Sequence, residues 1–372
     1  MKMRFTSEVI SLIIFAGINL TGWCESNPII NIPTESKTIG FTKKIVWVWG
    51  LPRKTIQDAY AEVDLVKRTG FNTIVTDGRG PQSQAYLKAA IEYAHNQNIG
   101  VWTLVSPIYG EWGWQKAPGV SIPEGCLQEY PSETLATLDN PQDPDRVQYS
   151  GPWMCIDRPE VRRYAIELSV SRLASNAFDG IALDFVGYKN YRGCQCTYSS
   201  NLRAAYAKTH RELSGGEIER RFSLSMLQLF YQEVRDAVKK QFPKAEIACH
   251  AYPQFDPEPI NGPLLPVDYP GDTVAWFFKP HWSLEKIAAQ CREIKNKEHQ
   301  AHNYVTGTAL MGIGTDAQNG KTPEQIRQEI KTIKQTGIQA IMIVGSDSLL
   351  KDPMIIKVLA EELSNANSTA IR

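Results

Sequence analysis

The sequence predicts a single-domain (β/α)8 barrel, and three observations support this. Short apolar segments typical of buried parallel strands alternate with longer segments of helical periodicity. The alternation gives eight strand–helix units with no linker-like break, which favours one closed barrel over an open two-domain sheet. One of the strands delivers a carboxylate, Asp184, at its carboxyl end, where such barrels carry their active sites. The strands are expected at residues 44–50, 71–76, 101–106, 181–185, 246–250, 273–278, 303–307 and 340–344.

The helices between these strands are bounded by residues that start or end helices. Gly70 follows the first, and Asp157 is expected to cap the third, with Pro159 in its first turn. Ser214-Gly215-Gly216 divides one long helical region, 200–241, into two parts. Helices are expected at residues 56–68, 83–96, 157–176, 200–241, 284–296, 323–335 and 352–363.

Composition excludes several classes of partner. The 372 residues contain 40 basic and 40 acidic side chains, so nothing favours nucleic acid or an anionic membrane surface. No Gly-rich phosphate loop is present, and no cofactor or metal is expected. Nine Trp and fifteen Tyr residues suit flat, partly apolar ligands such as sugar rings, although core packing accounts for most of them.

The N-terminus has the pattern of an export signal. Lys2 and Arg4 precede the apolar run Val9–Leu20, which is too short to span a bilayer comfortably. Cys24 is a possible lipid anchor, although Trp23 occupies a position where a lipidation signal has a small residue. The chain is therefore expected in the periplasm, at the cell surface or outside the cell. The predicted organisation is a signal peptide at 1–24, a linker at 25–42, the barrel at 43–364 and a tail at 365–372.

Six cysteines remain once Cys24 is set aside, and an even number in an exported protein permits disulfides. Four of them, Cys126, Cys155, Cys194 and Cys196, match a metal site by number alone. Their C-x-C spacing and wide gaps do not match ordinary zinc spacing. Disulfides or free thiols are therefore expected in place of a metal site. We predict that at least one of Cys194 and Cys196 pairs with Cys126 or Cys155 and joins two loops of the active face.

The residues that follow each strand form the predicted functional face. Asp184 is the first candidate catalytic residue, and the partner acid is expected among Glu258, Asp256 and Asp347, in that order. A long segment, 107–156, follows the third strand, and loops of that length are usually functional. The candidate substrate-binding residues are Trp49, Asp77, Tyr109, Trp112, Tyr188, His250, Tyr252, Lys279, His281 and Trp282.

Carboxylates beside aromatic side chains are what glycoside hydrolysis requires. One carboxyl group protonates the leaving oxygen, and the other acts as nucleophile or activates water. Other hydrolases fit poorly, because the chain lacks the G-x-S-x-G elbow and the H-E-x-x-H motif. A family 18 chitinase has a similar strand, but its catalytic Glu would fall at Val186.

Two segments resemble the bacterial glycosyl-hydrolase-like barrel proteins. Asp157–Tyr164 and Phe178–Phe185 are similar to that family's "PEVR…(Y)DVDGIHLD" pattern, and residues 221–243 resemble its helix and exit to strand five. The resemblance implies hydrolysis of glycosidic bonds, with Asp184 at the position of the catalytic carboxylate. The chain departs from the family's "DYxRYP" after Asp184 and adds the Cys-bearing insertion Arg192–Cys196.

The favoured hypothesis is an exported glycoside hydrolase that cleaves a polysaccharide or oligosaccharide. Asp184 would act as its nucleophile or as a stabiliser of the transition state. The alternative is a barrel that binds carbohydrate without cleaving it. A second carboxylate within about 10 Å of Asp184 would favour the enzyme, since catalytic pairs lie within that separation.

Overall fold

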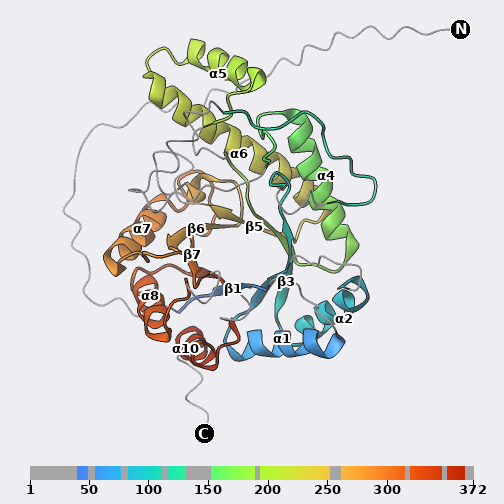
Figure 1. The fold of residues 1–372 in the computed structure, drawn as a ribbon, viewed down its shortest axis with the longest axis vertical. Helices are drawn as coiled ribbons and strands as arrows, with labels where there is room; N and C mark the ends of the chain where they lie inside the picture. The colour runs from blue at the N-terminus through green and yellow to red at the C-terminus, as the bar shows by residue number, and fades with distance from the viewer. Residues whose placement is uncertain are drawn as a thin grey trace, which may run out of the picture. The chain divides into compact units, whose positions relative to one another are not determined.

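Eight parallel strands close into a barrel, as the sequence predicts (Figure 1). The computed structural model describes residues 40–48, 55–76, 83–110, 116–130, 152–188, 193–251, 261–314, 319–345 and 350–364. The predicted signal peptide, most of the predicted linker and the predicted tail lie outside these residues. The strands are β1 (Lys43–Trp47), β2 (Thr73–Thr76), β3 (Gly100–Val105), β4 (Gly180–Leu183), β5 (Glu246–Ala251), β6 (Tyr269–Ala275), β7 (Thr308–Gly312) and β8 (Ala340–Val344).

Helices surround the barrel, and α5 lies outside this ring against α6 (Figure 1). None of the helices in the described part of the chain is long and apolar enough to cross a membrane. The α-helices are α1 (Ile56–Arg68), α2 (Ser83–Asn96), α4 (Pro159–Ser175), α5 (Thr197–Thr209), α6 (Gly215–Gln241), α7 (Leu284–Lys297), α8 (Pro323–Gln335) and α10 (Pro353–Leu363), and a short 3₁₀ helix, η1, covers Gly262–Leu264.

The barrel closes where β1 pairs with β8, with Ile45 opposite Met342. Both faces of each strand are covered, which explains why the strands are almost continuously apolar. Glycine is required where β4 approaches β5, because a Cβ on Gly180 would lie 2.3 Å from the Glu246 carbonyl oxygen. Such close approaches let the strands pack tightly enough to form one ring.

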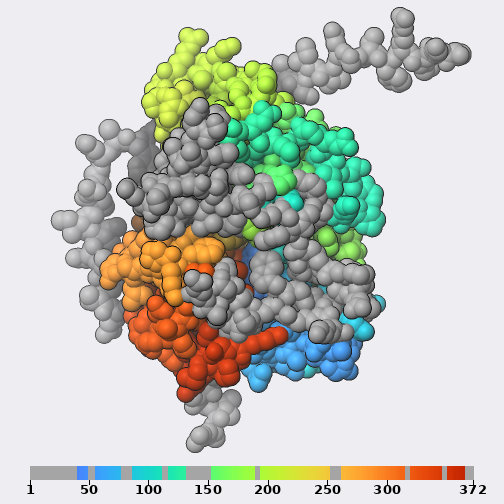
Figure 2. All heavy atoms as spheres, viewed as in Figure 1, coloured from blue at the N-terminus to red at the C-terminus, as the bar shows by residue number. Residues whose placement is uncertain are grey.

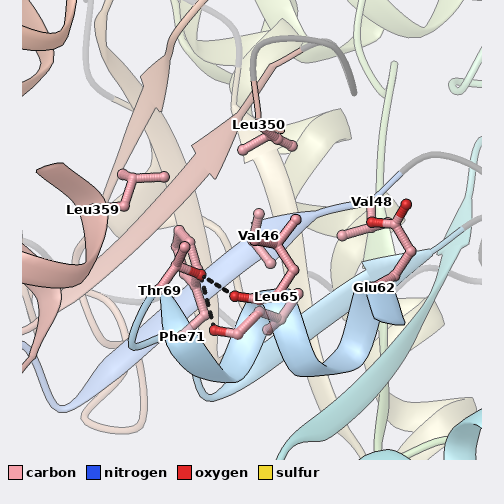
Figure 3. A pocket seen from close by; sticks show the side chains of 9 residues that line it. Val46, Val48, Glu62, Leu65, Thr69, Phe71, Leu350 and Leu359 are labelled. Carbon is pink, nitrogen blue, oxygen red and sulfur yellow. Dashed lines mark hydrogen bonds between the residues drawn. The ribbon is translucent and has the colours of Figure 1, made fainter. Parts of the chain in front are cut away.

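A small apolar pocket marks the packing of α1 on the outside of β1 (Figure 3). Val46 of β1 and Val48, which follows β1, meet residues of α1 and α10 there. The Thr69 hydroxyl donates to the carbonyl oxygens of Leu65 and Val66 at the end of α1. The lining is largely aliphatic. This pocket therefore belongs to the layer between strands and helices and not to the strand ends.

The predicted helices 56–68, 83–96 and 323–335 are confirmed to the residue. Strands six and seven were misplaced: β6 begins at Tyr269, four residues before the predicted Thr273, and β7 begins at Thr308 after the predicted segment has ended. Pro270 and Gly271 disfavour a strand by local rules. Pairing with β5 nevertheless holds them in the sheet, with Ala248 opposite Tyr269.

The predicted cap of the third helix was also wrong. Arg158 occupies the N-cap of α4 and makes no side-chain capping bond. The Asp157 carboxylate instead accepts a hydrogen bond from the Tyr188 hydroxyl at 2.5 Å. The Asp157 side chain therefore bonds to Tyr188, which is distant in the sequence, and not to the first backbone N–H groups of α4.

Candidate active site

Asp184 follows β4 directly and lies at the carboxyl end of the barrel. Its backbone N–H still donates to the Val105 carbonyl of β3 at 3.0 Å, so the residue is held in the sheet. The residue is 2 % exposed, and its Oδ1 accepts the Phe185 backbone N–H at 2.9 Å. The fold therefore holds a carboxylate in one orientation in a largely apolar setting, where an ionised group is costly.

The turn after Asp184 has an unusual backbone. Phe185 has a φ of 52°, in the left-handed region that non-glycine residues rarely adopt. Its ring stacks on Tyr109 at 4.6 Å and meets Trp153 edge-on at 6.3 Å, distances that join ring centroids. Conformations of this kind persist only where the surroundings enforce them, and they concentrate at functional sites. The aromatic contacts supply that enforcement here.

His250 of β5 joins Asp184 to β6. Its Nδ1 lies 3.3 Å from Asp184 Oδ1, and its Nε2 lies 2.9 Å from the Thr273 hydroxyl oxygen. The distances fit an imidazole whose Nδ1–H faces the carboxylate while Nε2 accepts from Thr273. Three neighbouring strands thus contribute one polar chain, Asp184–His250–Thr273, at the predicted functional face.

Aromatic rings enclose the imidazole of this polar chain. Trp47 meets His250 edge-on at 6.1 Å and Phe277 lies 5.9 Å away, between ring centroids. Gly312 makes room for Phe277, because a Cβ there would lie 2.4 Å from its ring. Sequence reasoning missed Trp47, Thr273 and Phe277. Trp47 could have been predicted, because it lies two residues before the predicted binding residue Trp49. Residues two apart in an extended strand lie on the same face.

Tyr188 and Asp157 form a second buried contact beside this site. Burial raises the pKa of Tyr188 well above its ordinary value and also raises the pKa of Asp157, against the opposing effect of hydrogen bonds from Ser199 and Tyr188. Tyr188 is 1 % exposed. The structure thus places this predicted sugar-binding residue in a hydrogen bond within the core, and a role toward sugar stays a prediction.

Three other predicted binding residues lie on the segment after β6. Trp282 stacks on Trp276 with 5.8 Å between ring centroids, and His281 Nε2 lies 3.1 Å from the Asn319 carbonyl oxygen. Burial lowers the pKa of His281, and Lys279 is exposed. These side chains lie on a different strand end from Asp184. The remaining predicted residues, Glu258, Asp256, Asp347, Trp49, Asp77, Trp112 and Tyr252, lie outside the described residues.

The cysteines singled out from the sequence lie close together. The thiols of Cys155, Cys194 and Cys196 all lie within 4.8 Å of one another and could hold a metal ion. Cys126 is near them, because its carbonyl oxygen accepts the Cys155 N–H at 2.7 Å. All six described cysteines are free thiols, so the predicted disulfide is not formed in the structure.

Asp272, next to Thr273 on β6, is a further buried carboxyl group, besides Asp184 and Asp157. Successive residues of a strand face opposite sides, and Asp272 accepts the Gly262 N–H of η1 at 2.9 Å while Thr273 faces His250. Burial raises the pKa of Asp272 to about 7, against the opposing effects of that hydrogen bond and of Lys297. Asp272 is therefore a group whose ionisation opposes folding.

We expect Asp272→Asn to flatten the pH dependence of stability. At pH values between the ordinary pKa of an Asp and about 7, Asp272 holds a proton in the folded protein that it has lost in the unfolded chain. The free energy of unfolding therefore falls as the pH rises through this range. Each pKa unit corresponds to about 1.4 kcal/mol. Urea unfolding at pH 4.5 and pH 8 should show a smaller loss for the variant, by a few kcal/mol. Equal losses in both proteins would contradict this assignment.

Comparison with known proteins shows where else this fold occurs. No family model matches the chain, and no curated protein matches it.

Among solved structures, the glycoside hydrolase domain of PgaB (BpsB) from Bordetella bronchiseptica aligns with a TM-score of 0.62 and 11 % identity. The alignment covers 87 % of this chain and 99 % of that one. A β-galactosidase from Bacillus circulans sp. alkalophilus aligns with a TM-score of 0.56 and 13 % identity, over 88 % of this chain and 56 % of that one. A β-galactosidase from the psychrophilic Marinomonas ef1 gives a TM-score of 0.54 and 8 % identity, over 86 % and 58 %. At these identities the likeness shows a shared fold.

Proposed function

We propose that this chain is a glycoside hydrolase whose reaction depends on Asp184. The observation that carries the proposal is the placement of this carboxylate: it is oriented by Phe185 N–H and lies 3.3 Å from His250 at the carboxyl end of the barrel. That end is where (β/α)8 enzymes hold their catalytic residues. The occurrence of the same fold in glycoside hydrolases supports the proposal.

Asp184 would act on the positive charge that develops at the anomeric carbon. A carboxylate there either attacks that carbon or stabilises the oxocarbenium-like transition state. His250 acts as a positioning residue, because its Nδ1 faces Asp184 Oδ1 while its Nε2 is held by Thr273. The leaving oxygen needs a separate acid, which we assign to Glu258, Asp256 or Asp347, in that order.

The aromatic residues around the polar chain suit a sugar substrate. Trp47, Phe277 and the Tyr109–Phe185 stack lie close to Asp184 or His250, and their faces and edges fit apolar sugar surfaces. These rings are only 2–8 % exposed, and we propose a polysaccharide or oligosaccharide as the substrate because they border the polar chain. The near-complete burial of Asp184 favours the second candidate, a carbohydrate-binding barrel without turnover.

The test is a screen of the purified chain on a panel of polysaccharides, scored by release of reducing ends. Asp184→Asn is purified and assayed in parallel, which identifies activity from a contaminating glycosidase. Release by the wild-type chain and not by the variant is the expected result. Oligosaccharide binding without release by either protein would replace the hydrolase with the carbohydrate-binding barrel.

We also propose that the chain is exported and loses its N-terminus. The charged start and the apolar run Val9–Leu20 form a signal-like segment. N-terminal sequencing of protein from the native host should show that roughly the first twenty residues or more are absent. An intact Met1 on cytoplasmic protein would exclude export by this segment. A lipid on Cys24 would appear as added mass on the mature N-terminus.

A further inference from the structure

Three thiols from two separated segments meet beside the N-terminus of α5. Cys155 precedes α4, and Cys194 and Cys196 precede α5. All three are buried, and their sulfur atoms lie within 4.8 Å of one another. We propose that these cysteines, with Cys126 as the fourth ligand, bind one structural Zn²⁺ ion. The site is independent of the proposed glycosidase activity.

The spacing of the sulfur atoms fits tetrahedral zinc. Zn–S bonds of about 2.3 Å place the sulfurs of a tetrahedral site about 3.8 Å apart. The sulfurs of Cys155 and Cys196 are 4.0 Å apart. A disulfide would use two of the three clustered thiols and leave the third buried beside them, whereas a metal uses all three. The Ser199 hydroxyl, 3.2 Å from Cys155 Sγ and 3.3 Å from Cys196 Sγ, also faces the cluster.

The surroundings of Cys194 stabilise negative charge on its sulfur, as a metal-bound thiolate requires. The backbone N–H groups of Glu129 and Cys196 both donate to Cys194 Sγ at 3.4 Å. Cys196 is the N-cap of the 13-residue helix α5, where the helix dipole favours an anion. The Arg158 guanidinium interacts with the thiols of Cys126 and Cys196. Hydrogen bonds and positive charge of this kind are typical of the outer shell of thiolate sites.

The Cys126 thiol is not one of the three sulfurs that lie within 4.8 Å of one another, but the backbone ties it to them, and we assign it as the fourth ligand. Its carbonyl oxygen accepts the Cys155 N–H at 2.7 Å, and the next residues, Leu127 and Met154, form an antiparallel bridge. Cys126 also shares the Arg158 guanidinium with Cys196. The four thiols therefore come from three segments that are far apart in the chain.

A metal at this position would fasten the segment that follows Asp184. Gln128, close to Cys126, donates to the carbonyl oxygens of Gly187 at 2.8 Å and Met154 at 2.9 Å. The segment 116–130, α4 and α5 lie on the same side of the barrel (Figure 1), and Figure 2 shows the surface of 116–130 and of α5 on that side. The ion would thus tie three segments to one another on this side of the molecule, and their wide separation in the chain would follow from this role.

The test measures the metal content of the full chain purified without chelator. We expect one Zn²⁺ per chain for the wild type, with loss of the ion in Cys194→Ser. Cys291→Ser removes an equally buried thiol on α7, outside the cluster, and should keep its zinc. Chelation should lower the melting temperature of the wild type, and added Zn²⁺ should restore it. X-ray absorption at the zinc edge should show sulfur ligands at about 2.3 Å.

A second measurement covers the case in which Cys194→Ser does not fold. Wild-type protein is treated with a chelator or with Zn²⁺ and then alkylated, and the modified residues are identified by mass spectrometry. Zn²⁺ should protect Cys126, Cys155, Cys194 and Cys196 and leave Cys249 and Cys291 unaffected. A disulfide among the four in native protein would overturn the proposal. Free thiols that take up no Zn²⁺, or equal zinc loss in both variants, would overturn it as well.

Discussion

Asp184→Asn is expected to lower turnover on the cleaved glycan by at least roughly two to three orders of magnitude, the range for removing one group that stabilises transition-state charge. The amide keeps the side-chain volume and an oxygen that can accept the Phe185 N–H, now seen at 2.9 Å. The amide lacks the negative charge that stabilises the positive charge of the oxocarbenium-like transition state. Because that interaction is made mainly in the transition state, kcat should fall much more than substrate affinity.

Turnover and thermal melting should be measured on the same preparation. The melting temperature should stay close to that of the wild type or rise slightly, since functional sites often carry costly groups. Asp179→Asn is a matched control at the other end of β4, where the carboxylate accepts the Val101 N–H at 2.8 Å and is 41 % exposed. It should leave turnover unchanged. Near-wild-type turnover for Asp184→Asn would remove Asp184 from the mechanism, and activity lost only through a much lower melting temperature would make it a structural residue.

Lys321→Met is expected to destabilise the protein by about 3–5 kcal/mol, the usual result of removing one partner of a buried ion pair. Lys321 Nζ lies 2.6 Å from Glu329 Oε2, with side chains 0 % and 5 % exposed. Burial already raises the pKa of Glu329 and lowers that of Lys321. Without the lysine, the glutamate becomes an uncompensated charge between α8 and the barrel.

The double variant Lys321→Met, Glu329→Leu should regain most of the lost stability, because no buried charge remains. The loss in the single variant should also shrink as pH falls, since a Glu329 whose pKa is raised takes up a proton in the folded state. Lys331→Met, on the same helix and 48 % exposed, is the control and should change stability little. Denaturant unfolding measures all three free energies. Equal losses in the single and double variants would show that the pair is not coupled.

Most of the helices could be predicted from the sequence because their signals are local. Thr55 and Thr322 cap α1 and α8 with capping boxes, which is the pattern that predicts a helix start. Strands are less local, since their bounds depend on the neighbours with which they pair. β6 therefore begins at Tyr269, despite the Pro and Gly that follow.

The candidate site also has a part that the sequence predicts and a part that depends on how the strands pair. A buried strand precedes Asp184, and in a (β/α)8 barrel the carboxyl ends of all strands lie on one face. These two facts were enough to place Asp184 and His250 on the same face. Their pairing at 3.3 Å, and the part played by Thr273, depend on the register between β4, β5 and β6. No local pattern marks Thr273, because a threonine within a strand is ordinary.

By itself, the sequence determined the barrel, most helix bounds and the carboxylate at the end of β4, because periodicity, capping and strand order are properties of short segments. Only the tertiary structure decided that Asp157 binds Tyr188 instead of capping α4, and that Cys155 meets Cys194 and Cys196. Barrel closure and long loops bring these residues together across 31 and about 40 positions of the chain. Contacts of that range are decided by how the elements pack, which no local signal records.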